Sequence, residues 1–596
     1  MQRLRNYNFF WVTSFGFSWH RLLRRTLERS VHYSTFFSTA KNAKGQRKVH
    51  KAFAFGAVTS EAFAVKSFVL LCAFMSLWLN SIAQRQDISL NNNWQTTLNK
   101  KEWKTINIPH NWDDYHGYRR LLHGNLHGDA VYKKTITIKQ PKTGKRFFLF
   151  FEGVGSYATV FLNNKKVGKH SGGRTTFTID ITEVLKTDGS KNELMVEASH
   201  PANIQDQPWV CGGCSDERGF SEGSQPMGIF RPVHLMVTND IRIAPFGVHA
   251  WAEVKEGKAD LSVSTTVKNY SSEQRNIILL QQFINNKGKI IAATNVNKTL
   301  AKGDSISIPI SNISITNPIL WSVENPYLYK IVTLIKENNI VIDKLETDFG
   351  FRTIKWNNPS HQFTLNGKPV FLNGIAEYEH LLGQSHAFSN EQIDSRIKWI
   401  QAAGFNAFRD GHQPHNLLYG KRFNEKGILW WTQLSAHVWY DTKEFRNNFK
   451  TLLREWVVER RNDPSVILWG LQNESKLPKD FAEECTALIR SLDPTASAQR
   501  LVTTCNGGEG TDWDVPQNWT GTYGGNPATY GEDLKQQILV GEYGAWRTID
   551  LHTEGGFNQN GAYSEDRMTQ LMEQKIRLAE KVKDSVAGHF MWLLTS

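Results

Sequence analysis

The sequence has few cysteines, and they do not form a pattern typical of a structural zinc site. The five cysteines are Cys72, Cys211, Cys214, Cys485 and Cys505. Cys211 and Cys214 make one C-x-x-C pair, and the sequence lacks the second pair that a four-cysteine zinc site needs. The pair therefore indicates either a local disulfide or two loop thiols.

Positive charge is also scarce once the amino-terminal region is set aside. The formal net charge is +13 over 596 residues, but residues 1–83 hold twelve Lys or Arg and only two acids, which leaves about +3 for the remainder. A nucleic-acid-binding protein carries its basic residues as a stripe on the folded domains. This distribution argues against nucleic acid as a partner.

A short apolar run near the amino terminus predicts a secretory signal peptide. Residues 68–83 read FVLLCAFMSLWLNSIA and end in the small-x-small pattern SIA. The run is shorter than a membrane span, and polar sequence follows it at once. We therefore expect a signal peptide at 66–83, a periplasmic or secreted protein with no stable membrane anchor, and a leader at 1–65 that is disordered or lies outside the working protein.

Two stretches of short alternating strands follow the signal peptide. Residues 84–240 contain VYKKTITI, FFLFFEGV, TFTIDI and NELMVEA, and this alternation predicts an antiparallel β-sandwich. Residues 241–350 contain ADLSVSTTVKN, NIILLQQFIN and YLYKIVTLIK, which predict a second sandwich of immunoglobulin-like size. Neither stretch carries a nucleotide-binding loop or a metal-ligand spacing.

From about residue 351 to 596 the pattern changes to strands that alternate with helices. Eight strands can be counted, and they lie in VFLNGIAEYEH, FNAFRDGH, ILWWTQLS, VILWGLQNE, RLVTTCN, NWTGTYGG, ILVGEYG and GHFMWLL. This alternation predicts a (β/α)8 TIM barrel, whose chemistry lies at the carboxyl ends of its strands. The chain stops at Ser596, directly after strand eight, so we expect a barrel that is truncated before its closing helix.

Two strand ends in this barrel carry a glutamate. The apolar run 466–469 of strand four leads to Asn473 and Glu474, and the run 538–540 of strand seven leads to Glu542. Barrel closure brings both acids to one mouth, as glycoside hydrolysis requires. Carboxyl groups about 5–5.5 Å apart would predict retention of anomeric configuration, and about 6.5–9.5 Å inversion.

Several segments follow one another in a characteristic order: GSYATVFLNNKKVGKHSGG, GIFRPVHL, NPILWSVENPYLY, FGFRTI, FTLNGKPVFLNG, GFNAFRDGHQP, RRNDPSVILWGLQNES and GEYG. They resemble the successive motifs of glycoside hydrolase family 2, which includes β-galactosidases, β-glucuronidases and β-mannosidases, and the resemblance covers residues 94–596. It implies a sugar-binding jelly roll, an immunoglobulin-like sandwich and a catalytic barrel. It also implies that Glu474 is the general acid/base, that Glu542 is the nucleophile, and that Asn473 binds the sugar 2-OH.

Further residues near the predicted mouth are candidate substrate-binding residues. By the same resemblance Arg409 orients the nucleophile and Tyr523 bonds to it, while a structural ion pair is the alternative role of Arg409. Trp592 is either the floor of a sugar subsite or part of the barrel core. The other candidates are His412, His415, His437, Glu379 and His380. A satisfied loop histidine is the alternative role of His437, and a rim ion pair is the alternative role of Glu379 and His380.

Two departures from the family pattern bear on metal and substrate. Gln433 stands where magnesium-dependent members carry an acid, so we predict no metal and no cofactor. Many galactosidases have a histidine shortly after the nucleophile, where this chain reads Gly544-Ala545-Trp546, and Trp546 is a further candidate contact that leaves the sugar open.

Together these patterns predict a retaining exo-β-glycosidase that acts on oligosaccharides. β-Galactosidase is the leading expectation, and β-glucuronidase and β-mannosidase are the alternatives within the family. A non-catalytic carbohydrate-binding protein on a degenerate barrel is the alternative of another class. The sequence leaves the oligomeric state open.

Overall fold

The computed structural model divides the chain into two compact units, 1–79 and 80–596, and the residues described below all belong to the second. Described are residues 85–113, 126–209, 225–356, 361–381, 383–436, 440–475, 477–545 and 565–594. The predicted leader, the signal peptide, Cys211 and Cys214 lie outside these ranges. Within them no helix has the length and apolarity that a membrane crossing requires.

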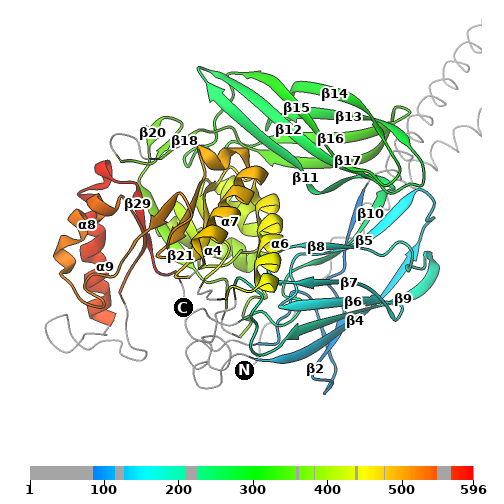
Figure 1. Ribbon diagram of the computed structural model, residues 1–596, viewed down its shortest axis with the longest axis horizontal. Helices are drawn as coiled ribbons and strands as arrows, with labels where there is room; N and C mark the ends of the chain where they lie inside the picture. Colours follow the sequence, from blue (N-terminus) through cyan, green and yellow to red (C-terminus); the bar gives the residue numbers. More distant parts are fainter. Residues whose placement is uncertain are drawn as a thin grey trace, which may run out of the picture. The chain divides into compact units, whose positions relative to one another are not determined.

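The first domain is a β-sandwich whose two sheets pack around a common apolar core (Figure 1). Along β6 (Tyr157–Leu162) every second residue is buried, as expected of a strand with one face on the core. The smaller sheet has the order β1 (Gln86–Ser89), β10 (Val233–Asn239), β5 (Lys145–Phe151), β8 (Phe177–Asp180). The larger sheet has the order β3 (Lys104–Ile106), β2 (Trp94–Leu98), β4 (Gly128–Lys139), β9 (Asp188–His200), β6, β7 (Lys165–Ser171).

The second domain is a sandwich of three strands against four. One sheet has the order β11 (Ile241–Lys255), β12 (Lys258–Asn269), β15 (Ser305–Thr316). The other has the order β14 (Ile290–Leu300), β13 (Arg275–Ile284), β16 (Tyr329–Glu337), β17 (Ile340–Phe349). The small strands β18 (Ile354–Lys355), β19 (Thr364–Leu365) and β20 (Lys368–Pro369) form a separate sheet before the barrel.

The third domain is a parallel barrel. Its described residues form nine strand segments, and two of these segments belong to one interrupted strand, which gives eight barrel strands. The segments are β21 (Leu372–Glu377), β22 (Ala407–Asp410), β23 (Leu429–Gln433), β24 (Val466–Asn473), β25 (Leu501–Cys505), β26 (Trp513–Val515), β27 (Gln517–Asn518), β28 (Leu539–Tyr543) and β29 (Gly588–Met591). The first pairs with the last, β21 with β29. Only Pro516 separates β26 from β27, and its carbonyl accepts a hydrogen bond from Gly541 N at 2.8 Å. Because proline cannot donate to the ladder, these two pieces form one interrupted sixth strand.

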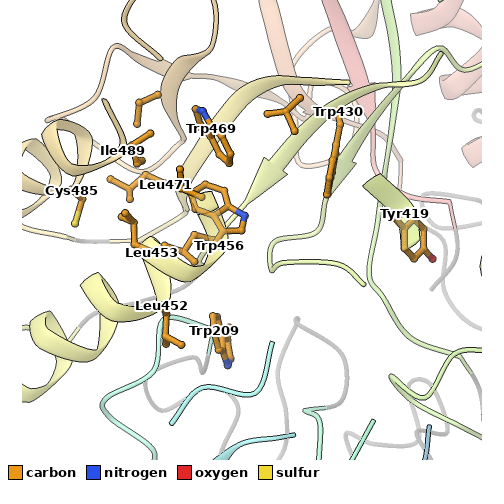
Figure 2. Packing of buried hydrophobic residues seen from close by; sticks show 14 of the residues in the cluster. Trp209, Tyr419, Trp430, Leu452, Leu453, Trp456, Trp469, Leu471, Cys485 and Ile489 are labelled. Carbon is orange, nitrogen blue, oxygen red and sulfur yellow. The ribbon is translucent and has the colours of Figure 1, made fainter. Parts of the chain in front are cut away.

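Helices cover the outside of the barrel and supply a second apolar layer (Figure 1). The helices are α4 (Asn390–Ala402), α5 (Leu417–Lys426), α6 (Lys443–Arg460), α7 (Lys479–Leu492), α8 (Tyr530–Gln537) and α9 (Glu565–Glu580). On α4 the residues with helical spacing, Ile393, Ile397 and Ile400, are buried. Figure 2 shows Leu453 and Trp456 of α6 against Trp469 of β24, and the Trp456 and Trp469 rings meet edge to face at 4.8 Å.

Strand β24 ends at Asn473, inside the segment VILWGLQNE predicted for strand four, and Glu474 follows it. Two other local expectations differ from the structure. Strand β28 begins after Ile538, which ends α8 with a φ of 66°, and it continues through Glu542. The sixth strand lies at 513–518, ahead of the predicted NWTGTYGG, because turns follow Asn518. A buried strand with polar residues gives no clear periodicity, which explains these shifts.

Replacing Leu453 by alanine should lower the free energy of unfolding of the barrel by about 2–5 kcal/mol, because the lost side chain leaves a cavity in a packed core. Leu453 is fully buried, whereas its neighbour Arg454 is exposed. The Arg454→Ala control should change this free energy by no more than about 0.5 kcal/mol. Urea unfolding followed by tryptophan fluorescence measures both, and equal losses in the two variants would contradict the packing of α6.

Candidate active site

Polar side chains gather at the carboxyl ends of the parallel barrel strands. Arg409 comes from β22, Gln433 ends β23, Asn473 ends β24, and Glu542 lies in β28. All four are buried, with exposures of 0–5%. Residues far apart in the chain therefore converge on one mouth, as a parallel barrel allows.

Arg409 holds this group together. Its Nη1 lies 2.9 Å from Glu542 Oε1 and donates to the Gly541 carbonyl at 2.6 Å. Its Nη2 donates to Asn473 Oδ1 at 2.6 Å, and its Nε donates to Gln433 Oε1 at 3.0 Å. A planar guanidinium has five donors in a fixed fork, so one side chain connects the ends of β23, β24 and β28.

His412 forms one wall of the site. It belongs to the segment 411–416 after β22, named the His412 loop below. Its Nδ1 lies 2.9 Å from Gln433 Oε1 and 3.3 Å from Arg409 Nη2. Its Nε2 is 3.7 Å from Glu542 Oε1, and its ring stacks on Trp592 with centroids 4.5 Å apart.

Glu474 lies beside the same group of residues. Its φ is 43°, a left-handed conformation that is uncommon for glutamate. Its backbone N–H donates to Cys505 O at 3.1 Å, and its side chain is partly exposed. A partly exposed carboxyl at the edge of a buried site can exchange protons with solvent.

Cys505 of β25 lies against the segments that carry both glutamates, because its carbonyl accepts from Glu474 N and its thiol packs on Gly541, next to Glu542. Burial raises its pKa most, Arg409 opposes that rise, and the charges of Glu542 and Glu474 raise the pKa further. A Cβ placed on Gly541 would lie 2.5 Å from Cys505 Sγ, so β25 and β28 approach closely across the barrel. Glu474, directly after β24, and Glu542, in β28, therefore lie at the same end of the barrel.

Asp410 is a buried supporting residue that the sequence analysis missed. Its carboxylate accepts hydrogen bonds from Trp430 Nε1 at 2.9 Å, Thr432 Oγ1 at 2.8 Å and Gln433 N at 3.1 Å, and His415 Nδ1 lies 3.1 Å away. A buried carboxylate needs such donors. The acid in the FRDGH stretch, at the end of a buried strand, was the signal that could have revealed it.

Lys575 of α9 is a second supporting residue that the sequence analysis missed. Its Nζ donates to the Gly544 carbonyl at 3.0 Å, two residues after Glu542. Burial lowers the pKa of Lys575 to about 8. The lysine thereby fixes the turn that follows the candidate nucleophile. The position of Lys575 on a helix could not predict its contact with the Gly544 carbonyl.

The remaining predicted residues are placed as follows. Both carboxylate oxygens of Glu379 are engaged, by Arg231 Nη2 at 2.6 Å and Asn416 N at 2.6 Å, which fits the ion-pair alternative. His380 is buried and stacks on Tyr378 with centroids 5.2 Å apart.

Three predicted residues are exposed or lie outside the described ranges. Tyr523 is 72% exposed with its ring 5.7 Å from Trp519, and its bond to the nucleophile stays a prediction. His437 and Trp546 lie outside the described residues.

The metal prediction can be compared with the side chains around Gln433. Among the residues that the structure describes, no cluster of three or more His, Cys, Asp or Glu is placed to hold a metal ion. Gln433 Oε1 is bonded to Arg409 and lies within bonding distance of His412. The absence of a metal or cofactor stays a prediction.

Sequence models of protein families match three stretches of the chain. "Glycosyl hydrolase 2 galactose-binding domain-like" matches 122–211, "Glycosyl hydrolases family 2" matches 241–352, and "Glycosyl hydrolases family 2, TIM barrel domain" matches 357–517. Together these stretches cover more than half of the chain.

Similar proteins include enzymes of two named activities. The chain is 28% identical to a β-glucuronidase of Bacteroides fragilis, over 88% of this chain and 78% of that enzyme. It is 27% identical to a β-galactosidase of Thermoanaerobacter pseudethanolicus, over 69% of this chain and 54% of that enzyme.

Solved structures share the fold. The structure of a Bacteroides uniformis β-glucuronidase has a TM-score of 0.75 at 22% identity, over 86% of this chain and 65% of that one. A putative β-galactosidase from Bacteroides fragilis has a TM-score of 0.73 at 23% identity, over 85% of this chain and 79% of that one. With its two sandwiches, its parallel barrel and the three matching family models, the chain belongs to glycoside hydrolase family 2.

Proposed function

We propose that this protein is a retaining exo-β-glycosidase that removes a terminal non-reducing sugar from an oligosaccharide or glycoside. The observation that carries the proposal is the bridge that Arg409 makes between Glu542 and Asn473, next to Glu474. Such a bridge fixes one carboxylate for attack and leaves the other at the edge of the mouth for proton transfer. Two carboxyl groups in these separate roles are what glycoside hydrolysis needs.

In the first step Glu542 attacks the anomeric carbon while the glycosidic bond breaks and Glu474 gives its proton to the leaving oxygen. In the second step Glu474 takes a proton from water, the water oxygen attacks the same carbon, and Glu542 is released. Arg409 orients the Glu542 carboxylate for attack in the first step and pairs with it again when water releases it in the second.

Asn473 is suited to bind the sugar next to the reacting carbon. Its Oδ1 accepts from Arg409 Nη2, so its Nδ2 points the other way and has no hydrogen-bond partner among the described residues. A buried amide donor at the mouth can bind the sugar 2-OH, an interaction that strengthens as the ring flattens.

β-Glucuronides are the leading substrate class, and β-galactosides are the second. The first class is supported by the relative with the longest match above, a β-glucuronidase aligned over 572 residues. The second is supported by the β-galactosidase relative, aligned over 420 residues. The leading expectation from the sequence, β-galactosidase, therefore becomes the second candidate.

The two carboxylates should respond differently to removal of their charge. Glu542→Gln should lower kcat by more than about 10³-fold on every substrate, because the nucleophile is lost. Glu474→Gln should lower kcat/KM about 10²–10⁴-fold for sugar leaving groups and much less for nitrophenyl ones, which need no acid. Steady-state kinetics measure both, with the exposed Glu532→Gln as a control that keeps wild-type rates. Wild-type turnover by Glu542→Gln would overturn the assignment.

A panel of 4-nitrophenyl glycosides tests the substrate class. The β-glucuronide should have a kcat/KM at least about 10²-fold above that of the β-galactoside. A site that binds the uronate carboxylate leaves its own polar groups unpaired when a neutral sugar binds. Proton NMR of the first product should show the β-anomer. Preference for the β-galactoside would select the second candidate, and an inert wild type would select the carbohydrate-binding alternative.

Removal of Arg409 should also destabilise the barrel. Arg409→Met leaves the Glu542 carboxylate buried without its main partner, and we expect the free energy of unfolding to fall by about 3–5 kcal/mol. Adding Glu542→Gln to that variant should restore part of the loss, because the unpaired charge is gone. Arg422→Met, which removes a partly exposed ion pair with Asp394, should cost no more than about 1 kcal/mol. Calorimetry measures all three, and an unchanged Arg409→Met would contradict the bridge.

A further inference from the structure

Two motifs of the first sandwich that the proposed reaction does not use meet at the barrel. GSYATVFLNNKKVGKHSGG leads directly to Arg174, and GIFRPVHL contains Arg231. Their side chains are only 1% and 2% exposed, and both guanidinium groups lie near the carboxylate of Glu379, which follows β21. Buried charge is costly unless it is paired, so this arrangement requires a partner on the barrel side.

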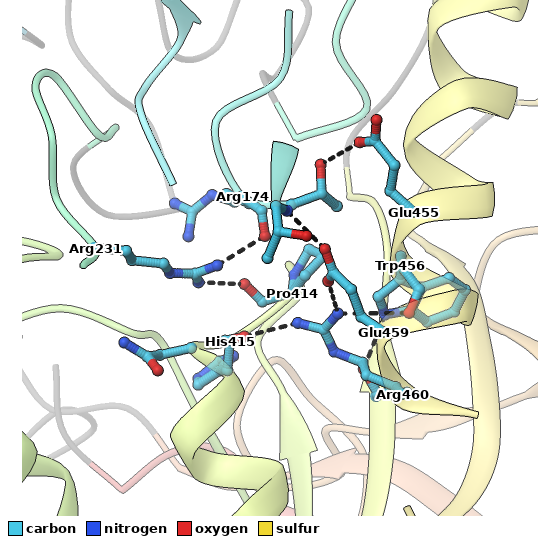
Figure 3. Close-up of polar contacts among 12 residues, drawn as sticks. Arg174, Arg231, Pro414, His415, Glu455, Trp456, Glu459 and Arg460 are labelled. Atoms are coloured by element: carbon cyan, nitrogen blue, oxygen red, sulfur yellow. Dashed lines mark hydrogen bonds and ion pairs between the residues drawn. The ribbon is translucent and has the colours of Figure 1, made fainter. Parts of the chain in front are cut away.

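Arg231 reaches from the sandwich into the His412 loop (Figure 3). Its Nη1 donates to Arg174 O at 2.7 Å. Its Nη2 donates to Glu379 Oε2 at 2.6 Å and to Pro414 O at 2.7 Å. One guanidinium therefore joins its own domain to two segments that leave the carboxyl ends of β21 and β22.

The next two residues of the same loop are also held through their backbone. Asn416 N donates to Glu379 Oε1 at 2.6 Å, so Glu379 links Arg231 to the loop a second time. His415 O accepts from Arg460 Nη2 at 2.8 Å. Charged side chains thus form hydrogen bonds with the backbone of three successive residues, 414–416. The backbone of the loop therefore has little freedom to shift.

The contact between Arg460 of α6 and the His412 loop also depends on the first sandwich. Glu459 Oε1 accepts from the Thr176 backbone N–H at 2.6 Å, and its other oxygen pairs with Arg460 (Figure 3). Gln413 Nε2 donates to Trp209 O at 3.0 Å, which adds a fourth tie from loop to sandwich.

The loop bears the residue that touches the reacting group. His412 precedes Pro414 by two positions, stacks on Trp592 and lies 3.7 Å from Glu542 Oε1. A shift of the Pro414 carbonyl moves His412 along with the backbone, and with it one wall of the site.

We infer that Arg231 is a positioning residue for catalysis, which sets the His412 loop, and thereby His412 beside Glu542, from the first sandwich. The inference rests on the proposed glycosidase function. It makes the first sandwich a part of the catalytic machinery through its contact with the loop, in addition to any sugar binding of its own.

The test compares two arginine variants in the full-length protein on the 4-nitrophenyl glycoside that the wild type hydrolyses fastest. Arg231→Met should lower kcat about 10- to 100-fold with KM changed less than about threefold, because misplacing a group by about 1 Å can cost that much without loss of the binding surface. Arg231→Lys should recover part of the loss, since an ammonium can reach Glu379 or Pro414 but lacks the fork that spans both.

The matched control is Arg85→Met. Arg85 Nη2 lies 2.8 Å from Asp343 Oδ2 and donates to Ile243 O at 2.6 Å, so it is a comparable arginine and carboxylate pair that leads to the second sandwich. Its loss should leave kcat within about twofold of wild type, because only contacts that hold the reacting groups affect the chemical step.

Glu379→Gln covers the case in which Arg231→Met does not fold. It keeps an acceptor for Asn416 N but removes the charge that pairs with Arg231, and kcat should fall about 3- to 10-fold, the loss expected for a weakened charged hydrogen bond. Unchanged kcat in folded Arg231→Met or in Glu379→Gln, or an equal fall in Arg85→Met, would overturn the inference alone. An inert wild type would overturn the proposed function and this inference with it.

Discussion

The site depends on one buried charge. Arg409 is fully buried, and the cost of taking a guanidinium out of water is met by Glu542, Asn473 and Gln433 together with the Gly541 carbonyl. Because these partners come from three other strand ends, the need to pair this charge fixes how the strands close at the mouth. The same contacts hold Asn473 and Glu542 on one guanidinium, so the pairing of this charge also sets the geometry on which the proposed reaction depends.

A similar constraint joins the first sandwich to the barrel. Arg231 and Arg174 are buried beside Glu379, and satisfying Arg231 requires the backbone of the His412 loop. The loop in turn carries His412 next to Glu542. Buried charges are often neutral for stability but demanding in geometry, which suits them to hold a loop in one position. The domain contact and the site are therefore parts of one hydrogen-bonded arrangement.

Much of this could be predicted from the sequence, because strand ends and helix faces are local features. The segment VILWGLQNE contains β24 as predicted, Glu474 directly follows that strand, and Glu542 lies in β28. The roles of Gln433 and Lys575 could not be predicted, because each depends on a partner that only the closed barrel brings near. For Glu379 the sequence left two roles open, and Arg231, which favours the ion pair, lies 148 residues away.

The central claim is that Glu542 reaches the anomeric carbon while Glu474 serves the leaving oxygen at the same mouth. Trapping the enzyme with a slow 2-deoxy-2-fluoro-β-glycosyl fluoride of its preferred sugar, followed by protein digestion and mass spectrometry, tests it most directly. The account predicts one glycosyl unit per chain, attached to Glu542. Attachment to Glu474 or to any other residue, or an enzyme that turns over substrate while no covalent adduct forms, would contradict it.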